Sequence, residues 1–129
     1  MRLEHIAFWV KDLELMRAFY CEYFGMTSNK RYHNPNKNFS SYFLTFPEGR
    51  ARIEIMHQPE LLELAENGIT YFGLTHIAIS VGSMAKVNEL TQKLESENYK
   101  IIGKPRVTGD GYYESVILDP EGNYIEITE

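Results

Sequence analysis

The sequence predicts an α+β fold built from two tandem βαβββ modules. Two observations support this prediction: a segment with strand-like alternation recurs in the second half of the chain, and each copy precedes a stretch with helical spacing. The repeated segments are LEHIAFWV at residues 3–10 and LTHIAISV at residues 74–81. Five positions are identical between them: Leu3/Leu74, His5/His76, Ile6/Ile77, Ala7/Ala78 and Val10/Val81.

Each repeated segment is expected to form a strand that leads into a capped helix. Alternation places Ile6, Phe8 and Val10 on one face of the first strand. Asp12 and Ser83 stand at equivalent positions after the two strands, and both residue types are good helix N-caps. Apolar residues follow each cap at helical spacing, so we expect two amphipathic helices, each packed on a sheet.

Each half then continues with three strands, of which the last two form a hairpin. A Pro-Glu-Gly turn recurs at residues 47–49 and 120–122, and an Ile-Glu-Ile triplet follows each copy. The predicted hairpin strands are residues 39–46 with 50–56 and residues 113–118 with 123–128. A shorter strand is expected before each hairpin, near residues 27–32 and 100–107.

We expect the 129 residues to form a single domain, with a first module of about 1–57, a linker of about 58–73 and a second module of about 74–129. The net charge of -5 and the isoelectric point near 5.4 argue against a nucleic acid or an anionic membrane as partner. Cys21 is the only cysteine, so no internal disulfide can form. With no leader-like start and no long apolar run, we expect a cytoplasmic protein.

One histidine and one glutamate in each half face away from the predicted helix-packed side. These residues are His5 and Glu54 in the first half and His76 and Glu126 in the second. Approximate two-fold symmetry between the halves would bring all four together. Two imidazoles and two carboxylates suit a divalent ion such as zinc, nickel, cobalt or iron, and the lack of thiolates favours a catalytic over a structural site. A single such residue is more often a solvated surface group, so the recurrence of the pair is what favours a metal centre.

The segments LEHIAFWV, RIEIM, LTHIAISV and DPEGNYIEI resemble the vicinal oxygen chelate superfamily, and most closely its glyoxalase I (lactoylglutathione lyase) branch. The resemblance covers nearly the whole chain and implies an open, cup-shaped mixed sheet around a metal site. It implies His5, Glu54, His76 and Glu126 as ligands of nickel, cobalt or zinc, with iron or manganese as alternatives. It also implies a homodimer in which each site takes His5 and Glu54 from one subunit and His76 and Glu126 from the other.

The resemblance further implies a reaction on a small-molecule substrate. The hemithioacetal of a thiol and a 2-oxoaldehyde such as methylglyoxal would be converted through an enediolate to a 2-hydroxyacyl thioester, with Glu126 as leading base and Glu54 as its counterpart. Members that use glutathione commonly carry arginine four residues after the first ligand, where this chain has Trp9. Gln58 stands where asparagine is frequent four residues after the second ligand. The thiol partner therefore stays open.

Three other functions stay open as well. An extradiol-type dioxygenase would use His5, His76 and Glu126 around ferrous iron, although Glu54 would then fill a position needed by substrate or oxygen. A thiol transferase of the fosfomycin-resistance kind would add a basic substrate loop, and a metal-free binding module would not need the four residues. Further polar side chains are candidates for contacting an anionic substrate, with surface solvation as the common alternative: His33, His57, Arg31, Arg52 and Lys104.

Overall fold

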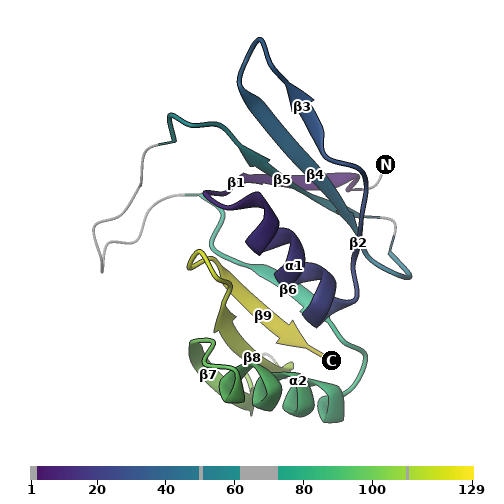
Figure 1. Ribbon diagram of the computed structural model, residues 1–129. Coiled ribbons are helices and arrows are strands. Elements are labelled where there is room, and N and C mark those ends of the chain that lie inside the picture. The colour runs from purple at the N-terminus through teal and green to yellow at the C-terminus, as the bar shows by residue number, and fades with distance from the viewer. Residues whose placement is uncertain (1–2, 50, 62–72, 110) are drawn as a thin grey trace. The chain divides into compact units, whose positions relative to one another are not determined.

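The protein is described by a computed structural model that covers residues 3–49, 51–61, 73–109 and 111–129 (Figure 1). The chain divides into two compact units, Met1–Tyr71 and Phe72–Glu129. In the described residues, each unit holds one mixed sheet and one long helix, which confirms the predicted α+β class. Most of the predicted linker, 58–73, lies outside the described residues.

The first unit carries a five-stranded sheet and helix α1. Its strands follow the order β1-β5-β4-β2, with β3 also paired to β4. Strand β1 runs parallel to β5, whereas the other pairs are antiparallel. The bounds are β1 (His5–Trp9), α1 (Leu13–Phe24), β2 (Thr27–Ser28), β3 (Tyr32–Asn34), β4 (Phe39–Thr45) and β5 (Arg52–His57).

The second unit has the predicted βαβββ order, and its strands are arranged as β6-β9-β8-β7. The bounds are β6 (Ile77–Ser80), α2 (Met84–Ser96), β7 (Ile101–Val107), β8 (Tyr113–Leu118) and β9 (Tyr124–Thr128). The parallel pairs have equivalent registers in the two units, since Ala7 lies beside Glu54 and Ala78 lies beside Glu126. The sequence repeat is therefore also a repeat of strand pairing.

Both helices begin at the predicted caps. The Asp12 side chain accepts hydrogen bonds from the backbone N–H groups of Glu14 and Leu15, at 3.0 and 2.9 Å. The Ser83 hydroxyl accepts one from the backbone N–H of Lys86 at 3.3 Å. These bonds satisfy N–H groups that have no partner within the first turn, and they fix where each helix starts.

Each helix covers one face of its own sheet. Helix α1 packs on β4 and β5, and α2 packs on β7, β8 and β9. The core side chains of the first unit are at most 2% exposed: Met16, Phe19, Tyr20, Leu44, Ile53 and Ile55. In the second unit the equivalent side chains are fully buried: Val87, Leu94, Ile117, Ile125 and Ile127. The opposite face of each sheet is not covered by its helix.

Two of the predicted strands differ from the observed ones. The predicted strand 27–32 is divided, since β2 ends at Ser28 and β3 begins at Tyr32. At the break, the backbone N–H of Phe43 donates to the side-chain oxygen of Asn29 at 2.8 Å instead of to a backbone carbonyl. The segment 74–81 is shorter than expected, since β6 begins at Ile77 and leaves His76 just before the strand. Because β2 and β3 replace one predicted strand, the described part of the first unit has one more strand than the predicted βαβββ module.

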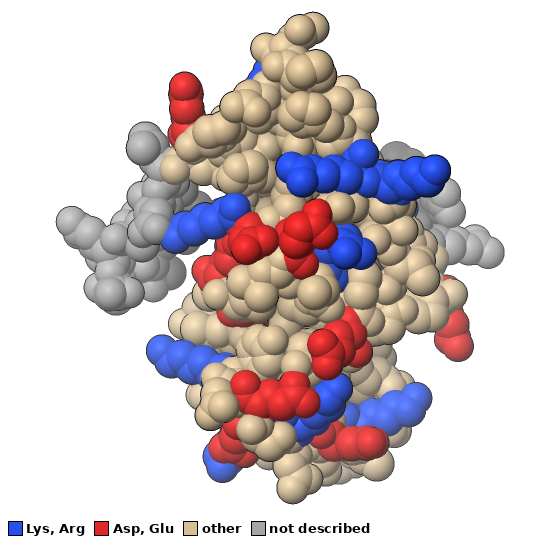
Figure 2. Space-filling view, in the orientation of Figure 1, with Lys and Arg blue, Asp and Glu red and all other residues tan. Residues whose placement is uncertain are grey.

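Among the described residues, no helix is long and apolar enough to cross a membrane. Acidic and basic side chains are interspersed over the face shown in Figure 2.

Candidate functional site

The first His–Glu pair lies on the face of the first sheet that α1 does not cover. Glu54 sits between two buried isoleucines of β5, so its side chain points to the opposite face. His5, at the start of β1, shares that face, and its Nε2 lies 3.9 Å from Oε2 of Glu54. The Glu54 side chain is 16% exposed and that of His5 37%, so the pair is accessible to a ligand.

Two neighbours contact the His5 ring, and Arg52 contacts both of them. Its Nδ1 is hydrogen-bonded to the Glu4 carboxylate, which also accepts a hydrogen bond from Arg52. The hydrogen bond with His5, together with that from Arg52, holds the pKa of Glu4 below its usual value. The Phe43 ring packs edge-on against the imidazole at 5.3 Å, and the Arg52 guanidinium lies 4.1 Å above the same phenyl ring. Because Nδ1 is engaged, Nε2 is the nitrogen left toward Glu54.

The second pair repeats the arrangement in the other unit. Glu126 lies between Ile125 and Ile127 of β9, which are fully buried, and its side chain is 23% exposed. Oε2 of Glu126 is 3.2 Å from Nε2 of His76. Thr75 stands where the first unit has Glu4, so this position of the repeat supplies a carboxylate in the first unit and a hydroxyl in the second.

The donor chemistry of the two pairs fits a divalent metal ion. Each pair offers an imidazole nitrogen next to a carboxylate oxygen, and the contact from Glu4 to the remote nitrogen of His5 is typical of histidines that bind metals. In residues 3–49, 51–61, 73–109 and 111–129, no group of three or more His, Cys, Asp or Glu side chains could hold an ion. The structure thus brings the four predicted residues together as two pairs, one in each unit.

Most of the other polar candidates lie away from this face. His57 follows Glu54 by three positions, so it faces the helix side, where its Nδ1 contacts the Val10 carbonyl at 2.9 Å. His33 contacts the Ser40 hydroxyl at 2.9 Å, and Lys104 pairs with Glu95 of α2 at 3.2 Å. Of the five candidates, only Arg52 shares a face with a His–Glu pair.

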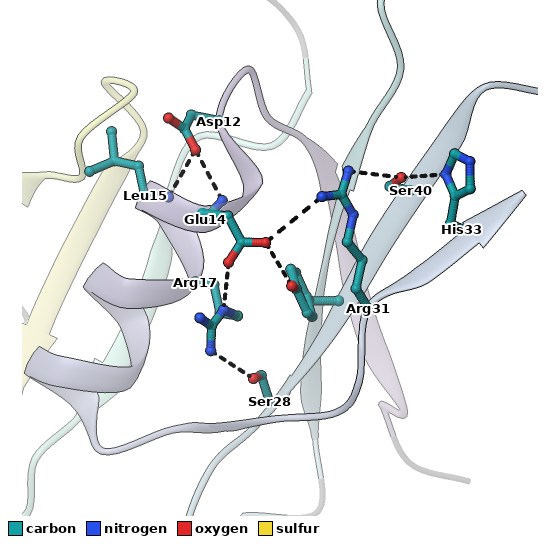
Figure 3. A network of polar contacts seen from close by, with 9 residues as sticks. Asp12, Glu14, Leu15, Arg17, Ser28, Arg31, His33 and Ser40 are labelled. Carbon is teal, nitrogen blue, oxygen red and sulfur yellow. Dashed lines mark hydrogen bonds and ion pairs between the residues drawn. The ribbon is translucent and has the colours of Figure 1, made fainter. Parts of the chain in front are cut away.

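Arg31 instead joins a polar network on the helix side, shown in Figure 3. It donates to Ser40 at 3.2 Å and lies 4.0 Å from Glu14, which also receives hydrogen bonds from Arg17 at 3.1 Å and the Tyr42 hydroxyl at 2.7 Å. The network ties α1 to the sheet and leaves Arg31 directed toward protein groups.

We expect Tyr42→Phe to weaken the acid sensitivity of folding. The Tyr42 hydrogen bond is the largest cause that lowers the pKa of Glu14 from its ordinary value near 4.5. A lowered folded-state pKa stabilises the fold above the ordinary value, and this contribution disappears as pH falls through the folded pKa. Urea midpoints measured from neutral pH to below 4.5 should therefore fall less steeply in Tyr42→Phe. Tyr112→Phe, an exposed control, should keep the wild-type slope, and equal slopes in all three proteins would contradict this account.

Comparisons with known proteins agree with the fold. The family model of the Glyoxalase/Bleomycin resistance protein/Dioxygenase superfamily matches residues 2–127. Uncharacterized protein YqjT of Bacillus subtilis is 26% identical over 97% of this chain and 96% of its own length. Lactoylglutathione lyase of Schizosaccharomyces pombe is 32% identical over 99% of this chain, which spans 45% of that enzyme. The crystal structure of a glyoxalase family protein from Enterococcus faecalis matches with a TM-score of 0.79 and 22% identity, over 99% of this chain and 97% of the other.

Proposed function

Because the chain belongs to the glyoxalase/bleomycin resistance protein/dioxygenase superfamily, we propose that it is a metal-dependent, glyoxalase I-like lyase. The substrate is the hemithioacetal of a thiol and a 2-oxoaldehyde such as methylglyoxal, and the product is a 2-hydroxyacyl thioester. The observation that carries the proposal is the His–Glu pair at equivalent positions of the sequence repeat, close together in each unit. The 32% identity to the Schizosaccharomyces pombe lactoylglutathione lyase supports the same reaction class.

The chain's carboxylates perform the proton transfer. Glu126 removes the proton from the carbon that bears sulfur and the hydroxyl group, the electron pair moves to form an enediolate, and the same carboxyl group returns the proton to the neighbouring carbon. The hydroxyl proton passes to the former carbonyl oxygen, so the carbonyl and hydroxyl groups exchange places. The reaction is redox-neutral and needs no second substrate. Glu54 is the symmetric counterpart of Glu126 in the first unit.

We assign His5, Glu54, His76 and Glu126 as the ligands of the ion, and the two modules with their linker act as a single domain. A bound nickel, cobalt or zinc ion supplies Lewis-acid stabilisation of the negative charge that develops on the substrate oxygens. Glu4 holds the His5 ring so that Nε2 is presented for binding. In a homodimer, one subunit would contribute the His5–Glu54 pair and its partner the His76–Glu126 pair. Light scattering of the metal-loaded protein should then give the mass of two chains.

The proposal is tested by metal content and turnover on the same sample. Protein purified without chelator is expected to contain a divalent metal and to form thioester from methylglyoxal with glutathione or a smaller thiol. Nickel, cobalt and zinc are added in turn to the chelator-treated protein. His5→Ala should lose metal and activity, whereas His33→Ala, which removes an imidazole on the helix side of the same unit, should retain both.

The outcomes separate the candidate functions. Metal with thioester formation supports the lyase and identifies its thiol. Metal without turnover for any thiol rejects the lyase and retains the four-residue site for another substrate with vicinal oxygens. Failure to bind any of the three metals would reject both the site and the reaction, and would favour a module that only binds small molecules.

A further inference from the structure

Three aromatic side chains lie together on the face that carries Glu54. Trp9, at the end of β1, contacts the Phe39 ring edge-on, with centroids 6.0 Å apart and planes at 89°. The Tyr32 ring also packs against Phe39, with the two ring centroids 6.1 Å apart. Trp9 is 46% exposed and Tyr32 52% exposed, so both rings offer free surface to a ligand. We call these three residues the aromatic cluster.

The aromatic cluster lies within the length of a small molecule from the first His–Glu pair. Trp9 is two positions after Ala7, which is the register partner of Glu54, so the strand separates the two levels by about 7 Å. Met56, the register partner of Trp9, stands on the same face of β5, two positions after Glu54. A ligand of modest size can therefore contact the His–Glu pair and the aromatic rings at once.

Within the strands of this face, the basic residue stands at the other end. Arg52 is the only lysine or arginine in strands β1, β3, β4 and β5, and it stands beside His5, on the side of Glu54 away from Trp9. It is already engaged by the Glu4 carboxylate and the Phe43 ring. The strands around the aromatic cluster thus provide rings for stacking and no cation for a carboxylate.

We propose that Trp9, Phe39 and Tyr32 form a subsite for an uncharged aromatic group at the end of the substrate remote from the reacting carbons. This inference rests on the proposed function, because it takes the His5–Glu54 pair as part of the reacting centre. It narrows the substrate class to hemithioacetals that carry an aryl or similarly planar apolar group. A substrate whose remote end is a carboxylate would bind poorly, since its charge would lose water without gaining a partner.

The single tryptophan of the chain, Trp9, makes binding directly observable. Chelator-treated full-length protein is titrated with 2-(benzylthio)ethanol, followed by tryptophan fluorescence. A matched thioether, (2-hydroxyethylthio)acetate, replaces the aryl group with a carboxylate. Neither compound can isomerise, so the readout is independent of turnover. We expect a saturable fluorescence change with the aryl compound and at least about tenfold weaker binding of the carboxylate compound.

Variants that keep the fluorescent reporter test the other two rings. Tyr32→Ala and Phe39→Leu should each weaken binding of the aryl thioether about three- to tenfold. Tyr112→Ala removes an exposed tyrosine of the second unit, 60% accessible, and should bind like the wild type. Circular dichroism establishes that each variant is folded. Because Tyr32 is largely exposed, its replacement keeps the test valid even if Phe39→Leu does not fold.

The failures of the two proposals are distinguishable. Thioester formation together with equal binding of both thioethers, or with no fluorescence response to either, would overturn the aromatic subsite and leave the lyase intact. Selective aryl binding that Tyr32→Ala weakens, in a protein that forms no thioester, would support the subsite and reject the lyase reaction. Loss of binding in Tyr112→Ala as well would overturn the subsite, since the effect would not be local.

Discussion

Replacing Glu126 by glutamine is expected to lower kcat/KM for thioester formation by about 10²–10⁴-fold while most bound metal is retained. The amide keeps the shape of the side chain and an oxygen able to bind a metal, but it cannot accept a proton from carbon. Its neighbours Ile125 and Ile127 are fully buried, so the strand that positions residue 126 should be unaffected. The measurement is steady-state kinetics of the metal-loaded variant beside its metal content.

Two further variants give this experiment its controls. Glu89→Gln makes the same chemical change on the exposed surface of α2 and should leave kcat/KM unchanged. Glu54→Gln separates the two carboxylates: a smaller loss than in Glu126→Gln supports Glu126 as the leading base. Wild-type activity in Glu126→Gln would remove this residue from the base role, and a larger loss in Glu54→Gln would transfer the role to the first pair.

Replacing Ile55 by alanine is expected to reduce the free energy of unfolding by about 2–5 kcal/mol. Ile55 is fully buried under α1, where it packs with the core of the first unit, so truncation removes apolar contacts and leaves a cavity. The adjacent Glu54 points to the other face and is partly exposed. Glu54→Gln should therefore change stability by no more than about 0.5 kcal/mol, which separates fold and function at neighbouring positions.

Urea unfolding followed by two probes measures this effect. Trp9 fluorescence reports on the first unit, and far-ultraviolet circular dichroism reports on both helices. The control is Ile102→Ala, where a 43% exposed isoleucine of strand β7 is truncated with a much smaller loss expected. A loss below about 1 kcal/mol in Ile55→Ala would show that the first unit relaxes around the missing side chain.

Strand alternation explains why much of the candidate site could be predicted from the sequence. The Ile-Glu-Ile triplets require one direction for the isoleucines and the other for the glutamates, and the structure shows this for Glu54 and Glu126. The helix starts at Asp12 and Ser83 were predictable because capping depends on a few adjacent residues. Local chemistry was sufficient for these features.

The remaining features depend on contacts between distant residues. The pairing of Glu4 with Arg52 joins positions that only the parallel register of β1 and β5 brings together. The break after β2 depends on a side-chain oxygen of Asn29 reaching the N–H of Phe43. Strand alternation places His57 on the helix side of the sheet, as the structure shows. Its polarity alone had made it a candidate for contacting substrate. Convergence of the two His–Glu pairs on one ion stays a prediction.

The two imidazoles differ in how much conformational freedom they keep after folding. His5 is confined by a carboxylate at Nδ1 and by the edge of a phenyl ring, so most of its rotamer entropy is lost when the chain folds. His76 precedes its strand, and threonine replaces the confining carboxylate. The first unit thus offers a ligand a ring held from its Nδ1 side, whereas the ring of the second unit is held at Nε2 by Glu126, so the duplicated halves differ in their entropic cost of binding.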